Sequence, residues 1–351
     1  MTIKNIIYGL GSILIVTGCS AYDENGSVLP PEEGIAWQYP GDEGIEDHPG
    51  VVFVENFETG TLEDIEEVWG HKSVREGQVM KFSNDIPEGS SGTRSLQMTA
   101  TRGVNVGGEL YKTFDPGWDK IYLRFYTKFA EDHGSYHHFV ALRGFKDPLP
   151  YPMGGAGQRP ENHFSVTIEP TRSPNTGHPP PGIWQFYAYW PEMRSWQSPE
   201  GVPDGRPNPY YGNSFRPEEP RGVPRNEWIA VEVMLKMNSS PEAKDGEMAL
   251  WIDGEQVMHF APGKPEGYWG SDSFRNDPDH PDAEPFEGFR WRHDMDVNIN
   301  VLRLQHYVSG TAFERSDQYA EDNPDLLINT EQATVWFDNV VMATEYIGPM
   351  K

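Results

Sequence analysis

Apolar and polar residues alternate along most of this chain with a period of two. This is the spacing of a β-strand, in which successive side chains point to opposite faces. The alternation is clearest at residues 120–129, 228–237, 248–257 and 297–307. Shorter runs predict further strands at residues 51–58, 95–101, 108–114, 163–169, 183–190 and 334–346. No segment has a convincing helical period. The pattern therefore predicts an all-β protein in which two antiparallel sheets pack face to face.

Turn and loop signals separate these strands. The Asp-Gly pairs at residues 245–246 and 253–254 each lie between alternating runs and predict tight hairpins. The chain has 36 glycines and 31 prolines among 351 residues, and its longest irregular segments span 145–181, 191–224 and 262–292. Loops of this length inside a compact domain are usually functional or disordered. We expect a single β domain over residues 50–351, with long Pro- and Gly-rich loops.

Residues 120–144 have the most distinctive pattern. Their first half alternates between an apolar face and a face that carries aromatic and cationic side chains, namely Arg124, Tyr126 and Lys128. The loop at residues 130–134 predicts a hairpin, whose second strand would bring in His137, His138 and Arg143. Such a face suits a flat, hydroxylated or anionic polymer, and the alternative is an ordinary exposed sheet face.

Two later strands carry a similar set of polar side chains. In the strand at 163–169, His163 shares a face with Ser165 and Thr167. In the strand at 183–190, one face carries Gln185, Tyr187 and Tyr189. Aromatic rings pack against apolar faces of ligands, and arginine pairs with carboxylate or sulfate in a bidentate way. We therefore expect Tyr187 and Tyr189 to line a binding groove together.

The first 49 residues have the composition of a targeting segment. Lys4 precedes an apolar run at residues 6–16, and residues 16–19 (Val-Thr-Gly-Cys) resemble a bacterial lipobox. That resemblance implies a signal peptide over residues 1–18, a lipid on Cys19 and a membrane-anchored protein of the bacterial cell envelope, in the outer membrane. Residues 19–49 are acidic and predict a disordered tether. Cys19 is the only cysteine, so the chain has no intrachain disulfide.

Charge narrows the range of partners. The formal net charge is −26, and no Lys or Arg occurs between residues 19 and 70. Nucleic acid is excluded as a partner because binding phosphates requires a basic footprint. Residues 143–225 have nearly balanced charges, so this central part of the chain can receive an anion. We expect a monomer that binds an acidic polysaccharide.

Several motifs together resemble the jelly-roll polysaccharide lyases, in particular the family 14-like group and its alginate- and glucuronan-cleaving relatives. The motifs lie at residues 122–129 (YLRFYTKF), 187–189 (YAY), 228–254 and 336–339 (WFDN). Residues 56–60 (NFETG) also resemble the start of many concanavalin A-like modules. The resemblance covers residues 51–348 and implies an antiparallel β-sandwich jelly roll that cleaves a uronic-acid polymer such as alginate, glucuronan or ulvan.

The resemblance also suggests which residues act. Where these lyases carry a catalytic lysine, this chain has His138, which can transfer a proton near neutral pH. Elimination needs a base, an acid and groups that neutralise the uronate carboxylate. We expect the catalytic set to be His138, Tyr307, His163 and Arg143. The expected substrate-binding set is Arg124, Tyr126, Lys128, Gln185, Tyr187, Tyr189, Gln305 and His306. As neighbours on one strand, His306 and Tyr307 cannot both face the groove.

Cofactor and alternative activities can be weighed in the same way. We expect no required cofactor, although Glu58 and Asp338 could meet at a rim and hold a structural calcium ion, as in related sandwich modules. The carboxylate spacing of a laminarinase-type hydrolase, the His-Glu-x-x-His motif of zinc enzymes and the Gly-x-Ser-x-Gly elbow of serine hydrolases are all missing from the sequence. Two readings stay open: a polysaccharide lyase, and a non-catalytic carbohydrate-binding surface lipoprotein.

Overall fold

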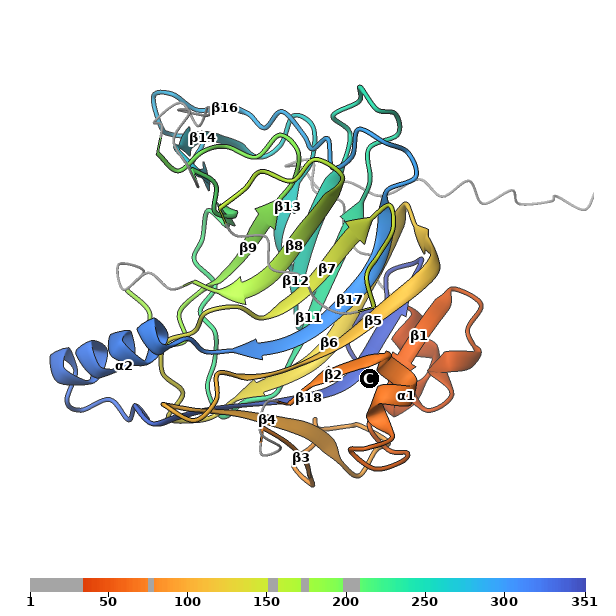
Figure 1. The fold of residues 1–351 in the computed structure, drawn as a ribbon, viewed down its shortest axis with the longest axis vertical. Coiled ribbons are helices and arrows are strands. Elements are labelled where there is room, and N and C mark those ends of the chain that lie inside the picture. Colours follow the sequence, from red (N-terminus) through yellow and green to blue (C-terminus); the bar gives the residue numbers. More distant parts are fainter. Residues whose placement is uncertain (1–33, 75–78, 151–156, 172–176, 198–208) are drawn as a thin grey trace, which may run out of the picture.

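The computed structural model describes residues 34–74, 79–150, 157–171, 177–197 and 209–351. These residues form two twisted β-sheets that pack against each other as a sandwich (Figure 1). One sheet has eight strands within the described ranges, in the order β13-β12-β11-β6-β18-β4-β3, with β1 paired to β18. The other has ten, in the order β16-β14-β15-β10-β9-β8-β7-β17-β5-β2. The predicted all-β antiparallel sandwich is thus confirmed, with one parallel pair, β10 and β15.

The predicted runs correspond to strands of the structure, but β10, β14, β15 and β16 lie in the segments 191–224 and 262–292 that the sequence predicts to be irregular. The eight-stranded sheet contains β1 (Val51–Glu55), β3 (Met80–Ser83), β4 (Ser95–Thr101), β6 (Lys120–Phe129), β11 (Ile229–Lys236), β12 (Glu247–Ile252), β13 (Glu255–Phe260) and β18 (Gln332–Ala343). The ten-stranded sheet contains β2 (His71–Ser73), β5 (Gly107–Trp118), β7 (Val140–Phe145), β8 (His163–Pro170), β9 (Trp184–Tyr189), β10 (Asn213–Arg216), β14 (Glu266–Gly270), β15 (Ser273–Asn276), β16 (Glu284–Pro285) and β17 (Asn298–Tyr307).

The main hydrophobic core fills the space between the two sheets. Ile121, Leu123 and Phe125 point into it from β6, and each is at most 1% exposed. Leu302 and Leu304 of β17 point into it from the other sheet and are fully buried. The predicted tight hairpin at Asp253-Gly254 forms between β12 and β13, whereas β11 and β12 pair across a longer connection over residues 237–246, so Asp245-Gly246 is not a tight hairpin. The two-residue period therefore gives the correct inward face of these strands.

The predicted hairpin between residues 120–129 and the following strand is wrong. β6 lies in the eight-stranded sheet between β11 and β18, whereas β7 lies in the ten-stranded sheet between β8 and β17. The connection crosses from one sheet to the other, and its Tyr136 and Phe139 are fully buried in the core. The Phe139 ring centroid lies 5.9 Å from that of Phe125 and 5.3 Å from that of Phe129. Burial of these rings between the sheets competes successfully with local pairing.

The predicted tether is also wrong for residues 34–49. They form three 3-10 turns, η1 (Ile35–Gln38), η2 (Pro40–Asp42) and η3 (Ile45–Asp47), that pack on the outer face of the eight-stranded sheet. Ile35 and Ile45 are buried there against β18. Asp42 forms an ion pair of 2.5 Å with the fully buried Arg124 of β6. The remainder of the predicted signal peptide and tether, with Cys19, lies outside the described residues.

This cover changes the role of the polar face of β6. Arg124 is bound by Asp42, Tyr126 accepts a hydrogen bond of 2.8 Å from the backbone N–H of Met350, and Lys128 contacts Asp85. All three side chains point away from the core as predicted, but Arg124 and Tyr126 meet the N- and C-terminal segments and Lys128 meets the connection between β3 and β4. The prediction that they bind substrate is therefore not supported by their location in the fold.

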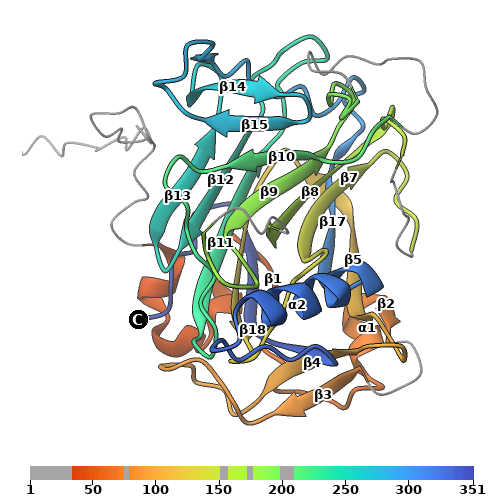
Figure 2. The ribbon, with the colours of Figure 1, turned by 90° about the vertical axis from the view of Figure 1, so that its left-hand side faces the viewer.

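Two α-helices interrupt the β structure, contrary to the expectation of none. α1 (Ile65–Trp69) is short, whereas α2 (Gly310–Asp322) follows β17 and lies at one end of the sandwich (Figure 2). Ser309 caps α2 by accepting a hydrogen bond from the Ala312 N–H. Arg102 at the end of β4 binds Asp317 at 2.8 Å and ties the helix to the eight-stranded sheet. Among the described residues, no helix is long and apolar enough to cross a membrane.

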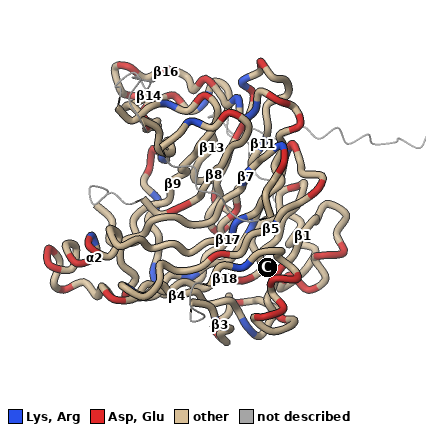
Figure 3. Tube along the Cα trace, in the orientation of Figure 1, with Lys and Arg blue, Asp and Glu red and all other residues tan. Residues whose placement is uncertain are grey.

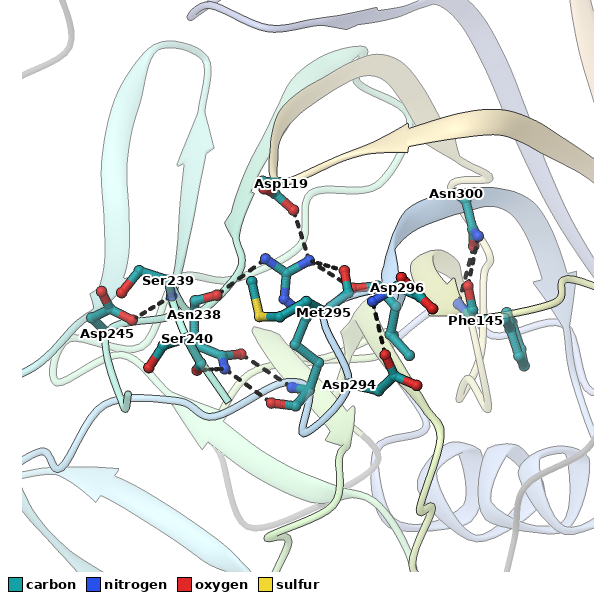
Figure 4. A network of polar contacts seen from close by, with 12 residues as sticks. Asp119, Phe145, Asn238, Ser239, Ser240, Asp245, Asp294, Met295, Asp296 and Asn300 are labelled. Carbon is teal, nitrogen blue, oxygen red and sulfur yellow. Dashed lines mark hydrogen bonds and ion pairs between the residues drawn. The ribbon is translucent and has the colours of Figure 1, made fainter. Parts of the chain in front are cut away.

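A buried polar network fixes the start of β17, as Figure 4 shows. Arg292, 2% exposed, donates hydrogen bonds to Asp119, the backbone carbonyl of Asn238 and the carbonyl of Val297 at 2.7, 3.1 and 2.7 Å. Nearby, the Asn300 amide exchanges two hydrogen bonds with the backbone of Phe145, at 2.7 and 3.1 Å. These two hydrogen bonds of Asn300 lie at a bulge in β17. They replace regular backbone hydrogen bonds between β7 and β17 and set the register of the two strands.

The ion pair under the N-terminal segment makes a testable prediction. Asp42→Ala leaves the guanidinium of Arg124 buried without its charge partner, so the free energy of unfolding should fall by about 3–5 kcal/mol. Denaturant unfolding of the protein measures this loss. Glu46→Ala, an exposed change in the next turn, serves as the control and should stay within about 0.5 kcal/mol of the wild type. Equal stability of both variants would contradict the role of the ion pair.

Candidate functional site

A groove of about 390 Å³ runs across the outer face of the ten-stranded sheet. Its lining comes from β2, β5, β7, β8, β9 and β17 and from the segment before β7. Figure 3 shows Lys and Arg among these strands, whereas Asp and Glu dominate the loops around the rim in this view. The lining residues are Ser73, Val106, Gly107, Gly108, Glu109, His137, His138, Arg143, His163, Ser165, Thr167, Tyr187, Tyr189, Arg303, Gln305, His306 and Tyr307.

Strand β17 forms the floor of the groove. Because successive side chains point to opposite faces, those of Arg303, Gln305 and Tyr307 face the groove, whereas those of Leu304 and His306 face the core, although His306 also borders the groove. The His306 ring is fully buried: Nδ1 lies 2.5 Å from the Tyr136 hydroxyl and Nε2 lies 2.8 Å from the carbonyl of Ala333. Burial lowers its pKa to about 3. The predicted substrate-binding role of His306 is therefore wrong, and Tyr307 is the residue of this pair that faces the groove.

His138 lies directly beside Tyr307. Their backbones exchange two hydrogen bonds of 3.1 Å, an antiparallel bridge that places both side chains on the same face. Their rings are stacked with centroids 6.0 Å apart. His138 Nδ1 lies 2.8 Å from Oε2 of Glu169, which is fully buried in β8. A carboxylate on one ring nitrogen fixes the orientation of the imidazole.

Arg143 and His163 extend the site along β7 and β8. Arg143 is 4% exposed, and burial together with the nearby charge of Arg303 lowers its pKa to about 10. It therefore stays cationic at neutral pH. The His163 ring stacks on Phe145 with centroids 5.2 Å apart, and burial and Arg143 lower its pKa to about 4. A neutral imidazole thus lies next to a buried cation.

Glu109 organises the other wall of the groove. It accepts a hydrogen bond of 2.6 Å from the Arg303 guanidinium and one of 2.9 Å from the Gln305 amide. Neither Glu109, Arg303 nor Glu169 was among the predicted site residues. The sequence could have indicated two of them: Arg303 lies two residues from Gln305 on β17 and Glu169 two residues from Thr167 on β8, so each shares a face with a groove residue. The pairing of Glu109 with β17 depends on strands that are distant in the sequence.

Tyr187 and Tyr189 form an aromatic wall, as predicted. Their ring centroids lie 5.6 Å apart in an edge-to-face arrangement, and the Tyr187 ring is 5.4 Å from that of His138. Gly212, directly before β10, lets the backbone approach Tyr187, because a Cβ at this position would lie 2.5 Å from the Tyr187 ring. Gln185 shares their face but is not among the groove-lining residues. Its side-chain carbonyl accepts a hydrogen bond of 3.3 Å from Arg216.

The expected calcium ligands lie at the other sheet and do not form a ligand cluster. Glu58 accepts hydrogen bonds from the backbone N–H groups of Thr93 and Arg94, each at 2.8 Å, and from the Thr93 hydroxyl at 2.7 Å. Asp338 is buried in β18, and Oδ2 has no hydrogen-bond partner among the described residues. These residues contain no group of three or more His, Cys, Asp or Glu side chains that could hold a metal ion.

Solved structures with similar folds include polysaccharide lyases. The alginate lyase vAL-1 from Chlorella virus has a TM-score of 0.50 and 12% identity, covering 83% of this chain and 100% of that chain. The alginate lyase Aly36B has a TM-score of 0.48 and 14% identity, covering 85% and 98%. An endo-β-1,4-glucuronan lyase from the fungus Trichoderma reesei has a TM-score of 0.43 and 15% identity, covering 84% and 95%.

At this level of identity the likeness defines the fold alone. The chain has the predicted jelly-roll β-sandwich fold, the architecture of these lyases. No family model and no curated protein matches the chain. The function proposed below therefore rests on the fold and the groove together.

The environment of Asp338 predicts a pH dependence of stability. Burial, and then the carboxylates of Glu58 and Asp42, raise its pKa to about 8. The folded state thus holds this proton more tightly than the unfolded state. The contribution of this proton to the free energy of unfolding is therefore complete below about pH 4 and is lost as the pH rises to about 8. Asp338→Asn, which cannot ionise, should be more stable than the wild type in alkaline buffer containing a chelator.

Denaturant unfolding of both proteins across this pH range measures the effect. Glu232, whose pKa is raised to about 7 mainly by burial, titrates in both proteins, so the difference between them isolates Asp338. Parallel pH profiles for the two proteins would contradict the assignment.

Proposed function

We propose that the groove binds a uronic-acid polymer and cleaves it by β-elimination. The observation that carries this proposal is the meeting of His138 and Tyr307 with the buried cation Arg143 in one groove. The two tyrosines beside them give a sugar ring an aromatic surface. The jelly-roll fold, which is also that of an alginate lyase, supports the same class of substrate.

The reaction sets clear chemical requirements. A base takes the proton from C5 of the uronate, and the electron pair of that bond becomes the C4–C5 double bond. The C4–O4 bond breaks, and an acid gives O4 a proton. One fragment then ends in an unsaturated uronate and the other in a new reducing end. The C5 proton is acidic enough only while the adjacent carboxylate is neutralised.

Arg143 and His163 suit the carboxylate. Arg143 is cationic and faces the groove, so a bound uronate would relieve its repulsion from Arg303. Arg303 itself is paired with Glu109. His163 is neutral at the pH of the reaction and can donate a hydrogen bond without adding charge. Together they would stabilise the enolate-like charge that builds up on the carboxylate.

His138 suits the role of base. When the Nδ1–H group of His138 donates a hydrogen bond to the Glu169 carboxylate, Nε2 carries the lone pair and can accept the C5 proton. The imidazolium that forms is then stabilised by the buried carboxylate, as in other histidine–carboxylate pairs. Glu169 is a positioning residue in this proposal. Tyr307, stacked on His138 and facing the same groove, would protonate O4.

A first experiment tests the two proton carriers. His138→Ala and Tyr307→Phe should each lower turnover on polyuronates by at least about a hundredfold, with much smaller changes in affinity, because proton transfer matters in the transition state. The ultraviolet absorbance of the unsaturated product on alginate, glucuronan and ulvan gives the rate. His178→Ala, outside the groove, is the matched control and should keep full activity.

Three results would change the assignment. Near-full activity of His138→Ala would remove His138 from the base role. Equal losses of turnover and stability in Tyr307→Phe would make Tyr307 a structural residue. If the wild type binds polyuronates but releases no unsaturated product, the protein is a carbohydrate-binding module.

We also propose that the protein is exported and lipid-anchored in the bacterial cell envelope, in the outer membrane. The lipobox-like residues 16–19 support this, because they place Cys19 directly after an apolar segment. Cys19→Ser should abolish lipid attachment and release the protein from the membrane fraction. Intact-mass analysis of the protein from its native host measures the modification, and an unmodified Cys19 in the wild type would overturn the proposal.

A further inference from the structure

Two arginines lie side by side beyond the end of the groove. Arg216 belongs to β10 and Arg275 to β15, and they are direct partners in the parallel register of these strands. Burial and the charge of Arg275 lower the pKa of Arg216. Arg275 is exposed and donates a hydrogen bond of 3.0 Å to the Tyr268 hydroxyl. Placing two guanidinium groups next to each other costs free energy that an anion between them would offset.

The arginine pair belongs to the same face of the same sheet as the groove. Glu169, which holds His138, is the register partner of Gln185 on β9. Gln185 in turn accepts the hydrogen bond from Arg216. On the opposite face, Phe215 and Phe274 are buried in the core, which confirms that their neighbours Arg216 and Arg275 point outward. A row of neighbouring side chains therefore crosses the sheet from His138, the proposed base, to the two arginines.

The arginines line a hollow of their own. It has a volume of about 600 Å³ and is lined by Arg216, Pro217, Glu218, Tyr268, Arg275, Asn276 and Asp277. Glu218 and Asp277 border it, but no ion pair joins a carboxylate to either arginine among the described residues. The Tyr268 ring is fixed by stacking on His280, with centroids 3.6 Å apart. The hollow thus combines a cationic pair with a rigid aromatic ring, the groups that bind an acidic sugar.

We propose that this hollow is a distal subsite that binds a carboxylate of the same polyuronate chain that occupies the groove, an inference that rests on the proposed function. From β8 to β15 there are three strand spacings, or about 14 Å. The arginine pair would therefore contact a sugar several units away from the bond that is cleaved. Its consequence is a preference for long chains, because a short oligosaccharide fills the groove without reaching the arginines.

The test measures binding and so does not depend on turnover. Calorimetry with the His138→Ala protein gives the affinity for polyuronate oligosaccharides of increasing length. We expect affinity to rise by at least about tenfold once the chain reaches the arginine pair, the gain of one charge-assisted contact. Arg216→Gln/Arg275→Gln should remove that step and leave the affinity for the shortest ligands unchanged. A carboxyl-reduced, neutral oligosaccharide of the same length should show no step in either protein.

A charge-matched control separates this effect from the loss of net positive charge. Arg102→Gln/Arg225→Gln removes two cations that line neither the groove nor the hollow, and it should keep the step. A step that survives in Arg216→Gln/Arg275→Gln, or that disappears equally in the control, overturns the distal subsite while leaving the groove assignment intact. If the step depends on the arginine pair but the wild-type protein shows no lyase activity, the result supports the subsite and overturns β-elimination. Absence of any polyuronate binding overturns both.

Discussion

The constraint on which this structure depends is that the central strands of the ten-stranded sheet, such as β8, β9 and β17, bury every second side chain against the other sheet. Leu302 and Leu304 of β17 satisfy that requirement, so Arg303 and Gln305 must point outward. The same rule applies in β8 and β9. Because these strands are neighbours, their outward residues meet in a single groove even though they are far apart in the sequence. The chemistry of the groove is thus a direct consequence of how the core is packed.

The two outer faces of the sandwich differ in how the described residues cover them. On the eight-stranded sheet, the 3-10 turns of residues 34–49 occupy the outer surface, and Asp42 neutralises Arg124 there. On the ten-stranded sheet, the described residues leave the outer face open as a groove and a neighbouring hollow. Similar cationic side chains therefore have different fates: Arg124 stabilises the fold, whereas Arg143 faces the groove.

Electrostatics reconcile an acidic protein with the proposed acidic ligand. The net charge of −26 repels polyanions at long range, but this repulsion is screened by salt over about 10 Å. Within the groove, Arg143 and Arg303 are held close together in a partly desolvated site, where Coulomb interactions are stronger. Glu109 balances only part of that charge. Local geometry, not net charge, therefore decides which ligand the groove favours.

The sequence by itself determined the strands, their inward faces and several groove residues, because all of these follow from a local period of two. Tyr187, Tyr189 and His163 could be placed on outward faces in this way. Only the tertiary structure decided which strands are neighbours, since pairing depends on burial of residues that are distant in the chain. It separated β6 from β7, ordered residues 34–49 and turned His306 into a core residue. The partnerships of Glu109 with Arg303 and of Glu169 with His138 required the same information, because alternation identifies a residue's face but not what that face meets.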